Sequence, residues 1–291
     1  MSKVIEMKNA KELSTEQFRK MQLTELDMLV EFDRICRLHN INYVLFGGSL
    51  LGAVRHKGYI PWDDDADIGM LREDYNRFKD ISGELNPKIC YFQDHDTDPE
   101  YRWGYGKLRR TGTKYIRVGQ EHLKCRTGIF VDVFPMDDIP LQVPWQILQD
   151  IHCCILRKIT YSEVGKFTRK GFIRIWYWLL SFIPMSFVYS QLRWYEKKSK
   201  SSSPNKVRCL MFKATGMLYQ KNPISTRYGM PKSWFTDRKE YDFEGDKFYS
   251  SRDYDTVLKY IYGDYMKLPP ENKRQQHSPF SAITFPDGSE G

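Results

Sequence analysis

The motif Gly47-Gly48-Ser49 constrains the fold of this chain more than any other feature of its sequence. The run before it, INYVLF (41–46), is β-branched and aromatic and has the length of a strand, and SLLGAVRH (49–56) after it predicts a short helix that begins at Ser49. The segment IPWDDDADIGML (60–71) then predicts a turn that runs into a second strand. A strand, a glycine turn, a helix and an acidic strand in this order indicate a mixed α/β domain.

The rest of the sequence supports this fold class. Hydrophobic residues make up 41% of the chain, enough for a sizeable core, which excludes disordered and fibrous classes. Ser14 and Gln17 predict a capping box for an amphipathic helix over 14–39. Further predicted elements are a helix over 73–82, two strands within 101–118 joined at Thr111-Gly112, a strand over 128–134 that Pro135 stops, a strand pair around Glu244-Gly245, a helix near 253–262, and an irregular tail.

Carboxylates gather on the second predicted strand. Asp65 and Asp67 are two residues apart, so on a strand they project from the same face. Two carboxylates this close repel each other unless a cation or a proton lies between them. Asp132 stands between two valines on a later strand, where a buried carboxylate is costly without a partner. Three such acids on neighbouring strands predict a site for Mg²⁺ or Mn²⁺.

The glycine turn supplies a complementary feature. Gly47 and Gly48 allow the backbone to approach a ligand closely, and the Ser49 hydroxyl and the amides at a helix start can hold a phosphate. A phosphate held beside a carboxylate-bound cation is what phosphoryl transfer requires, because the cation neutralises developing charge and aligns the attacking and leaving oxygens. The sequence therefore predicts an enzyme of phosphoryl transfer.

The segment GGSLLGAVRHKGYIPWDDDADIGM (47–70) resembles the signature of the LicD family, a group with the nucleotidyltransferase fold that includes the fukutin-related proteins. Further similarity lies in KLRRTGTKY (107–115), GIFVDVFPMDD (128–138), FEG (243–245) and YGDYMKLPPENKRQQH (262–277). The resemblance spans roughly residues 20–140 and 225–277. It implies an α/β (mixed α+β) fold with a nucleotidyltransferase-like mixed sheet flanked by helices.

The resemblance also implies an activity and a set of site residues. Members of the family transfer a substituted phosphate, typically phosphocholine from CDP-choline, onto a sugar hydroxyl of a surface glycan or its lipid-linked precursor, and CMP leaves. In relatives the donor is CDP-ribitol or a similar CDP-alcohol. By position, Asp65 and Asp67 match the family's metal-binding pair, Asp132 matches its third acid, and Asp63 fits an additional acid. We expect Asp132 to help deprotonate the acceptor hydroxyl.

Three basic residues are further candidates for donor binding. Arg55 follows the predicted phosphate-binding helix, and it either reaches the donor's diphosphate or belongs to a surface cluster. Lys107 and Arg109 are co-facial on a predicted strand and either bind phosphate oxygens or form a solvated face. The acids have simpler interpretations as well: Asp65 and Asp67 as a solvated acidic turn, and Asp132 as a strand-end cap.

Charge is distributed unevenly along the chain. The formal net charge is +8, yet residues 150–213 alone hold 13 Lys and Arg against three acids, so the rest is close to neutral. We therefore expect three parts: a catalytic core over 1–140, a helical, basic and apolar insert over 141–205 with a linker at 199–205, and a C-terminal part over 206–291 that completes the catalytic and acceptor region.

The insert has three interpretations. Residues 175–192 are uncharged, but Pro184 and several polar residues interrupt the run, so we favour a pair of amphipathic helices that lie at an anionic membrane surface. A buried helical hairpin and a single membrane span are the alternatives. Six cysteines without a C-x-x-C pair and an N-terminus without an apolar signal region predict a cytoplasmic enzyme, peripheral on the inner face of the plasma membrane.

Other functions remain open. The donor alcohol can be ribitol, glycerol or ethanolamine in place of choline, and a nucleotidyltransferase that modifies a small molecule or a protein would release pyrophosphate rather than CMP. A nucleic-acid-binding module is suggested only by the isoelectric point of about 9.0. Since the basic segment is strongly apolar as well, it suits lipid better, and we expect no nucleic-acid partner.

Overall fold

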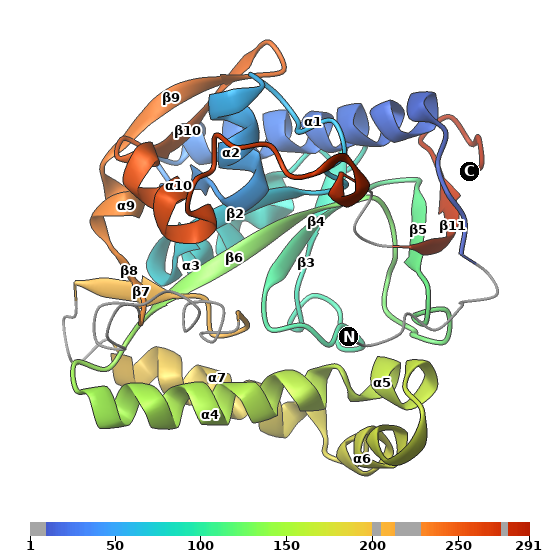
Figure 1. Cartoon of the computed structure of the whole chain (residues 1–291), viewed down its shortest axis with the longest axis vertical. Coiled ribbons are helices and arrows are strands. Elements are labelled where there is room, and N and C mark those ends of the chain that lie inside the picture. The colour runs from blue at the N-terminus through green and yellow to red at the C-terminus, as the bar shows by residue number, and fades with distance from the viewer. Residues whose placement is uncertain (1–9, 200–204, 213–227, 275–278) are drawn as a thin grey trace.

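The computed structural model describes residues 10–199, 205–212, 228–274 and 279–291. Most of the predicted linker at 199–205 and the last residues of the segment 262–277 lie outside these ranges. The predicted mixed α/β fold is confirmed, because a curled mixed sheet lies between helices and a separate helical layer lies below it (Figure 1).

The central sheet has the strand order β1-β2-β6-β4-β3, with β7 paired to the end of β6 and β8 paired to β7. β2 and β6 run parallel, and the other neighbours along this path are antiparallel. The strands are β1 (Val44–Leu45), β2 (Ala66–Leu71), β3 (Cys90–Gln93), β4 (Gly106–Arg110), β6 (Phe130–Asp138), β7 (Lys206–Arg208) and β8 (Met230–Pro231).

Helices cover both faces of this sheet. On one face α1 (Thr15–Leu38) and α3 (Arg72–Ile81) pack together, with the rings of Phe32 and Phe78 4.7 Å apart. On the other face lie α2 (Gly47–Arg55), α9 (Ser233–Thr236) and α10 (Tyr254–Tyr262). The predicted capping box of α1 is confirmed, since the Ser14 hydroxyl accepts from the Gln17 N–H and the Gln17 side chain accepts from the Ser14 N–H.

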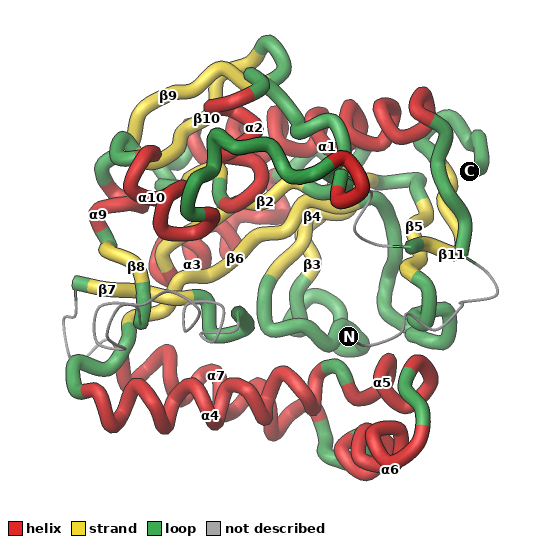
Figure 2. The backbone as a smooth tube through the Cα atoms, in the orientation of Figure 1, coloured by secondary structure: helices red, strands yellow, loops and turns green. Residues whose placement is uncertain are grey.

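The C-terminal part of the chain folds back onto the N-terminal part (Figure 2). β9 (Arg238–Phe243) and β10 (Asp246–Ser251) form the predicted hairpin at Glu244-Gly245. After α10 the described part of the predicted irregular tail holds only the short helix Glu271–Lys273. Beyond this tail a strand follows that was not predicted: β11 (Phe280–Thr284) pairs antiparallel with β5 (Lys114–Arg117), a partner far away along the chain.

Three predicted boundaries also differ from the structure. β6 does not stop at Pro135 but continues to Asp138. β4 pairs with β6 only as far as Val133 and β7 joins it at Asp137, so Pro135 lies where a missing N–H breaks no bond on that side. β1 has only two residues. α2 begins at Gly47 rather than Ser49, with Gly47 at a φ of +54°, a conformation that favours glycine.

The insert forms a layer of helices below the sheet (Figure 1). Its elements are α4 (Val143–Thr160), α5 (Ser162–Thr168), α6 (Gly171–Leu180) and α7 (Met185–Ser199), in place of the expected pair. No single helix within the described ranges has the length and apolar composition to cross a membrane. The segments Gly171–Leu180 and Met185–Lys197 pass that test only when taken together, and they meet at an angle of 77°.

Candidate active site

Asp67, Asp132 and Lys107 lie side by side across three adjacent strands. The register of β2 on β6 places Asp67 opposite Asp132, and the register of β4 on β6 places Lys107 opposite Asp132. The flanking apolar residues of β2 and β6 join the core under α1 and α3, so the acids project toward the face that carries α2 and α10. The Lys107 ammonium donates a hydrogen bond to an Asp132 carboxylate oxygen.

Asp65, the residue before β2, completes an acidic cluster. One carboxylate oxygen from each of Asp65, Asp67 and Asp132 lies within 4.8 Å of the other two. The structure thus brings together the three acids that the sequence singled out. Three hard oxygen donors at this spacing fit Mg²⁺ or Mn²⁺.

The cluster is electrostatically unfavourable on its own. Burial raises the pKa of Asp65 to about 6 and the pKa of Asp67 well above its ordinary value, and the neighbouring carboxylates add to both effects. Burial likewise raises the pKa of Asp63 to about 8. Arg117 offsets this only in part, with its Nη2 3.7 Å from Asp65 Oδ2. A divalent cation would supply the missing positive charge.

The two glycines allow these carboxylates to lie against the start of α2. A Cβ atom added at Gly48 would stand 2.3 Å from Asp63 Oδ2, and one added at Gly47 would stand 3.0 Å from Asp67 Oδ2. Side chains at either position would therefore displace an acid. The N-terminus of a helix also favours negative charge beside it. The absence of side chains at Gly47 and Gly48 therefore lets the acids pack against α2. Close approach of a phosphate to the backbone of these glycines stays a prediction.

Ser49 lies behind the cluster. It is buried, and its hydroxyl accepts a hydrogen bond of 2.8 Å from the Asp67 N–H. This contact ties α2 to the strand that carries the acids. The sequence predicted that Ser49 touches phosphate, whereas the structure engages the hydroxyl with the backbone of Asp67, which is a positioning role.

A cavity of about 390 Å³ opens over the acids. Arg55 lines it, and the Arg55 Nη1 donates a hydrogen bond of 2.8 Å to the Tyr265 carbonyl. Its wall also contains Gly48, Trp62, Asp63, Asp65, Asp67, Tyr262 and Lys267. The cavity has the size of a small-molecule site, roughly 300–1,000 Å³. Its lining contains a guanidinium and an ammonium group as well as the carboxylates.

Lys107 and Arg109 line a separate, smaller cavity together with Arg117. Both side chains are buried, so the interpretation as a solvated face is wrong. Burial lowers the pKa of Lys107 to about 7 although Asp132 faces it. Arg109 donates to Gln93 Oε1 at 2.7 Å and to the Gly128 carbonyl at 2.8 Å. The structure therefore ties Arg109 to the protein, and its contact with the donor stays a prediction.

Two residues near the acids were not predicted from the sequence. Glu25 on α1 is buried, and burial followed by the charges of Asp65, Asp64 and Asp63 raises its pKa well above the ordinary value. Its place on the buried face of an amphipathic helix was the available signal. Tyr262 ends α10 and lines the cavity, and burial followed by the charge of Asp67 raises its pKa. Tyr262 lies in a segment that resembles the LicD family, but nothing in the sequence singled out this residue.

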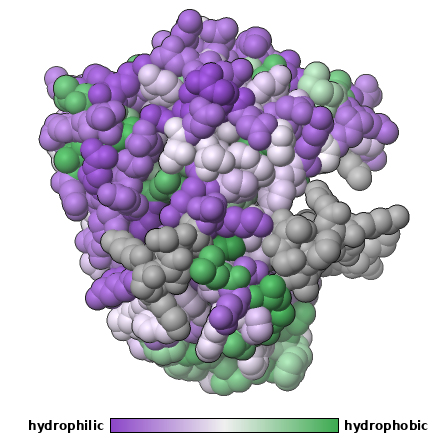
Figure 3. Space-filling view, turned by 90° about the vertical axis from the view of Figure 1, so that its left-hand side faces the viewer, coloured by the Kyte–Doolittle hydropathy of each residue, from purple (hydrophilic) through white to green (hydrophobic). Residues whose placement is uncertain are grey.

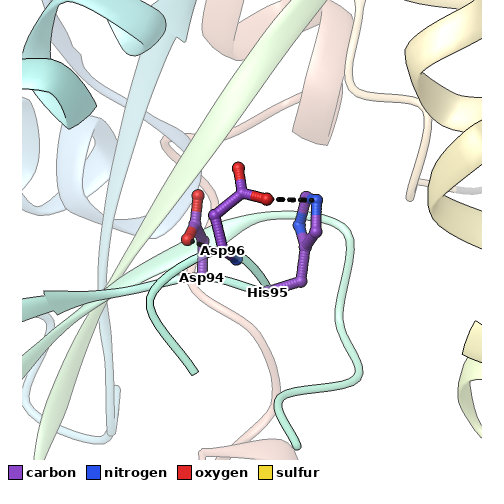
Figure 4. A group of neighbouring side chains, drawn as sticks. All are labelled: Asp94, His95 and Asp96. Carbon is purple, nitrogen blue, oxygen red and sulfur yellow. Dashed lines mark hydrogen bonds and ion pairs between the residues drawn. The ribbon is translucent and has the colours of Figure 1, made fainter. Parts of the chain in front are cut away.

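A second group with metal-ligand chemistry lies in the loop after β3. Asp94, His95 and Asp96 come together there (Figure 4). The Lys79 Nζ lies 2.5 Å from Asp96 Oδ2 and 3.7 Å from Asp94 Oδ2, and the His95 ring stacks on Tyr189 at 3.9 Å. Because the Lys79 ammonium already lies beside both carboxylates, we interpret the group as structural.

Comparison with known proteins places this geometry in a family. Residues 40–153 match the family described as LicD/FKTN/FKRP, nucleotidyltransferase domain. The chain carries a LicD-family domain. This LicD-family domain holds every acid, glycine and basic residue predicted for the site, from Gly47 to Asp132.

Individual relatives agree with this assignment of the domain. The chain is 29% identical over 282 residues to the lipopolysaccharide cholinephosphotransferase LicD of Haemophilus influenzae. The aligned residues cover 89% of this chain and 95% of that protein. The chain is 49% identical over 43 residues to the ribitol 5-phosphate transferase FKRP of Homo sapiens, covering 15% of this chain and 9% of that protein. An uncharacterised protein of Rickettsia prowazekii is 41% identical over 134 residues, which cover 44% of this chain and 47% of that protein.

These similarities confirm the predicted enzyme class. The chain is an enzyme that transfers a substituted phosphate group. The similarities do not identify the donor, the cation or the leaving group. The cavity and its carboxylates provide the basis for proposing them.

Proposed function

We propose that the protein transfers phosphocholine from CDP-choline onto a sugar hydroxyl of a surface glycan or of its lipid-linked precursor. Similarity to a cholinephosphotransferase over 89% of the chain supports phosphocholine as the transferred group. The shorter similarity to a ribitol 5-phosphate transferase supports the wider class of phosphate-linked alcohols.

The observation that carries this proposal is the acidic cluster at the start of α2. Asp65, Asp67 and Asp132 offer oxygens within 4.8 Å of one another beside a cavity of about 390 Å³. In the proposed enzyme they hold Mg²⁺ or Mn²⁺, with Asp63 as an additional ligand. Bound there, the cation neutralises the diphosphate and makes the transferred phosphorus more electrophilic.

The remaining cavity residues bind and orient the donor. Arg55 and Lys267 face the same space as the acids and provide donors for the phosphate oxygens. The half-buried Trp62 ring lies on the same wall, where it can stack on the cytosine base. The Tyr262 hydroxyl lies 3.7 Å from the Cβ position of Gly47, close enough to contact a phosphate held at the start of α2.

The chemical step exchanges one phosphoester bond for another. The acceptor oxygen bonds to the phosphorus that carries choline, and the bond from that phosphorus to the bridging oxygen breaks, so the bridging oxygen leaves with CMP. Asp132 accepts the proton of the sugar hydroxyl. Lys107 donates to Asp132 and thereby holds its carboxylate in place.

Analysis of the small product tests this proposal. Purified protein is incubated with CDP-choline, Mg²⁺ and a lipid-linked glycan extract, and nucleotides are separated by chromatography. We expect release of CMP that depends on both the extract and Mg²⁺ and that EDTA abolishes. Asp67→Asn should reduce the rate by at least about 100-fold, a typical loss on removing a catalytic electrostatic contact. Asp80→Asn, on the exposed side of α3, is the matched control.

Other outcomes would redirect or refute the proposal. CMP release from CDP-ribitol, CDP-glycerol or CDP-ethanolamine but not from CDP-choline would keep the reaction and change the donor. Release of pyrophosphate from a nucleoside triphosphate would favour nucleotidyl transfer. Full activity of Asp67→Asn, or full activity in EDTA, would refute the mechanism.

A further inference from the structure

The helix α6 is apolar except for Arg174 and yet is hardly covered by the protein. Phe172 is 80% exposed, Ile173 56% and Trp178 51%. Within α6 only Tyr177 is half-buried and only Leu180 is buried; Tyr177 packs on Gly165 and Leu180 joins the small core of the helical layer. A helix that is hydrophobic all round is normally buried, in a large core or in lipid.

The neighbouring α4 carries apolar residues on its outer face as well. Ile147, Ile151 and Ile155 recur at spacings of four and are 42%, 55% and 47% exposed. The opposite face is buried and holds Leu156 and Ile159. A helix that faces water carries polar side chains on its outer face, whereas the outer face of α4 is apolar. The outer face of α4 therefore extends the apolar surface of α6.

These residues form one large apolar surface on a single layer of the molecule. Of the 22 exposed large hydrophobic residues in the described ranges, 16 lie between Leu141 and Trp194. In Figure 3 hydrophobic residues gather at the lower end of the molecule, where the helical layer lies, and the upper part is mostly hydrophilic. Soluble monomers rarely expose contiguous apolar patches beyond a few hundred Å².

Positive charge borders this surface. Lys158, Arg169, Lys170 and Arg174 are exposed, and none has an ion-pair partner within the part of the chain that the structure describes. Residues 150–213 hold 13 Lys and Arg against three acids. Aromatic and aliphatic side chains bordered by Lys and Arg suit the interfacial region of a bilayer with anionic headgroups.

We propose that the layer α4–α7 docks onto an anionic membrane surface, with α6 embedded among the headgroups and the outer face of α4 beside it. At ten residues, α6 is about 15 Å long, half the thickness of a hydrocarbon core, so it lies at the interface rather than crossing it. The positive charge of this layer attracts anionic headgroups, whereas a second copy of the same basic layer would be repelled. We therefore favour anionic lipid as the partner. This inference does not depend on the donor or on the chemical step.

Vesicle co-sedimentation of the full chain, without donor or acceptor, tests the proposal. We expect binding to vesicles of phosphatidylcholine mixed with phosphatidylglycerol, and much weaker binding to phosphatidylcholine alone. The triple variant Phe172→Ser, Ile173→Ser, Trp176→Ser should weaken binding at least about tenfold, since each buried apolar side chain contributes about 1.5–3 kcal/mol. The matched control changes Leu23, Val30 and Leu38 to Ser, three exposed apolar residues of α1, and should bind like the wild type.

Charge reversal provides an independent variant in case the apolar substitutions prevent folding. Arg169→Glu, Lys170→Glu, Arg174→Glu should weaken binding at least about tenfold, because each basic residue contributes about 1 kcal/mol at an anionic surface. The control, Lys88→Glu, Lys114→Glu, Lys124→Glu, changes the net charge equally on the core. Failure of the wild type to bind, or equal loss in variants and controls, would overturn the proposal. So would a dimer that dissociates in the α6 variant while vesicle binding is absent.

Discussion

Asp67 and Asp132 lie opposite each other on the parallel strands β2 and β6. Lys107 donates a hydrogen bond to Asp132, and no ion pair of Asp67 is found within the described residues. Asp67 is left among carboxylates, and burial raises its pKa well above the ordinary value. Without a cation the protein therefore carries unfavourable free energy at this site, which cation binding would remove.

The first prediction concerns Asp67→Asn in the absence of divalent cations. The amide removes like-charge repulsion, so the melting temperature in EDTA should rise by a few degrees, corresponding to about 1 kcal/mol. Mg²⁺ should raise the melting temperature of the wild type and not that of the variant. Thermal melts in EDTA and in Mg²⁺ measure both effects, with Asp80→Asn as control. A variant that Mg²⁺ stabilises like the wild type would contradict the cation site.

The second prediction concerns pH. The pKa of Asp65 is raised by burial to about 6, so between about pH 4 and 6 the folded state binds more protons than the unfolded state. The Asp65 contribution to stability therefore falls as pH rises through this window. Lys107, whose pKa burial lowers to about 7, acts in the opposite direction only above about pH 7.

Comparison of the wild type with Asp65→Asn isolates this contribution from the other titrating groups. In EDTA, the stability gained by the variant should grow from pH 4.5 to about pH 7, by roughly 1–3 kcal/mol. Urea denaturation at several pH values gives the difference directly. A gain that shrinks with rising pH would mean that Asp65 is stabilised in its charged form by the protein alone.

The third prediction concerns the glycine turn. In Gly48→Ala the new methyl group would meet Asp63 Oδ2 at 2.3 Å, so Asp63 must move. We expect weaker Mg²⁺ binding and at least about tenfold lower activity, although alanine favours a helix by about 1 kcal/mol over glycine. In Gly83→Ala the methyl group meets nothing within 4 Å, and this variant should behave like the wild type. Equal effects of the two substitutions would argue that Gly48 serves only the helix.

The fourth prediction concerns the buried ion pair. Lys107→Met leaves the Asp132 carboxylate buried without its ammonium partner, which should lower the free energy of unfolding in EDTA by about 3–5 kcal/mol. Adding Asp132→Asn should restore most of that loss, because the uncompensated charge disappears. A double-mutant cycle by urea denaturation measures the interaction between them. Additive effects of the two substitutions would show that Lys107 and Asp132 do not interact.

Local patterns in the sequence were sufficient to predict the acidic cluster. The two-residue spacing of Asp65 and Asp67 fixes their common face on any strand, and the valines around Asp132 mark a buried strand with one carboxylate. The pairing of Asp67 with Asp132 was not predictable, because it depends on the register between strands far apart in the sequence. The same limitation hid β11, whose partner β5 lies more than a hundred residues away.

Side-chain roles were harder to predict than positions. Ser49 in a glycine turn suggests a phosphate ligand, and the structure adds a role that the sequence did not predict, because the hydroxyl accepts from the Asp67 N–H. Contact of Ser49 with a phosphate stays a prediction. Lys107 suggests a solvated cation until its strand neighbour Asp132 is known. Glu25 was missed as well, although the helical periodicity places this carboxylate on the buried face of α1 and could have pointed to it.

Calorimetric titration of CDP-choline tests the central claim most directly, because it needs no acceptor. The wild type should bind CDP-choline in Mg²⁺ and lose at least about tenfold in affinity in EDTA, since the carboxylates repel an uncompensated diphosphate. Asp67→Asn should bind weakly under both conditions, and Asp80→Asn should match the wild type. Equal affinity of the wild type in Mg²⁺ and in EDTA would contradict a cation-dependent donor site between β2 and β6.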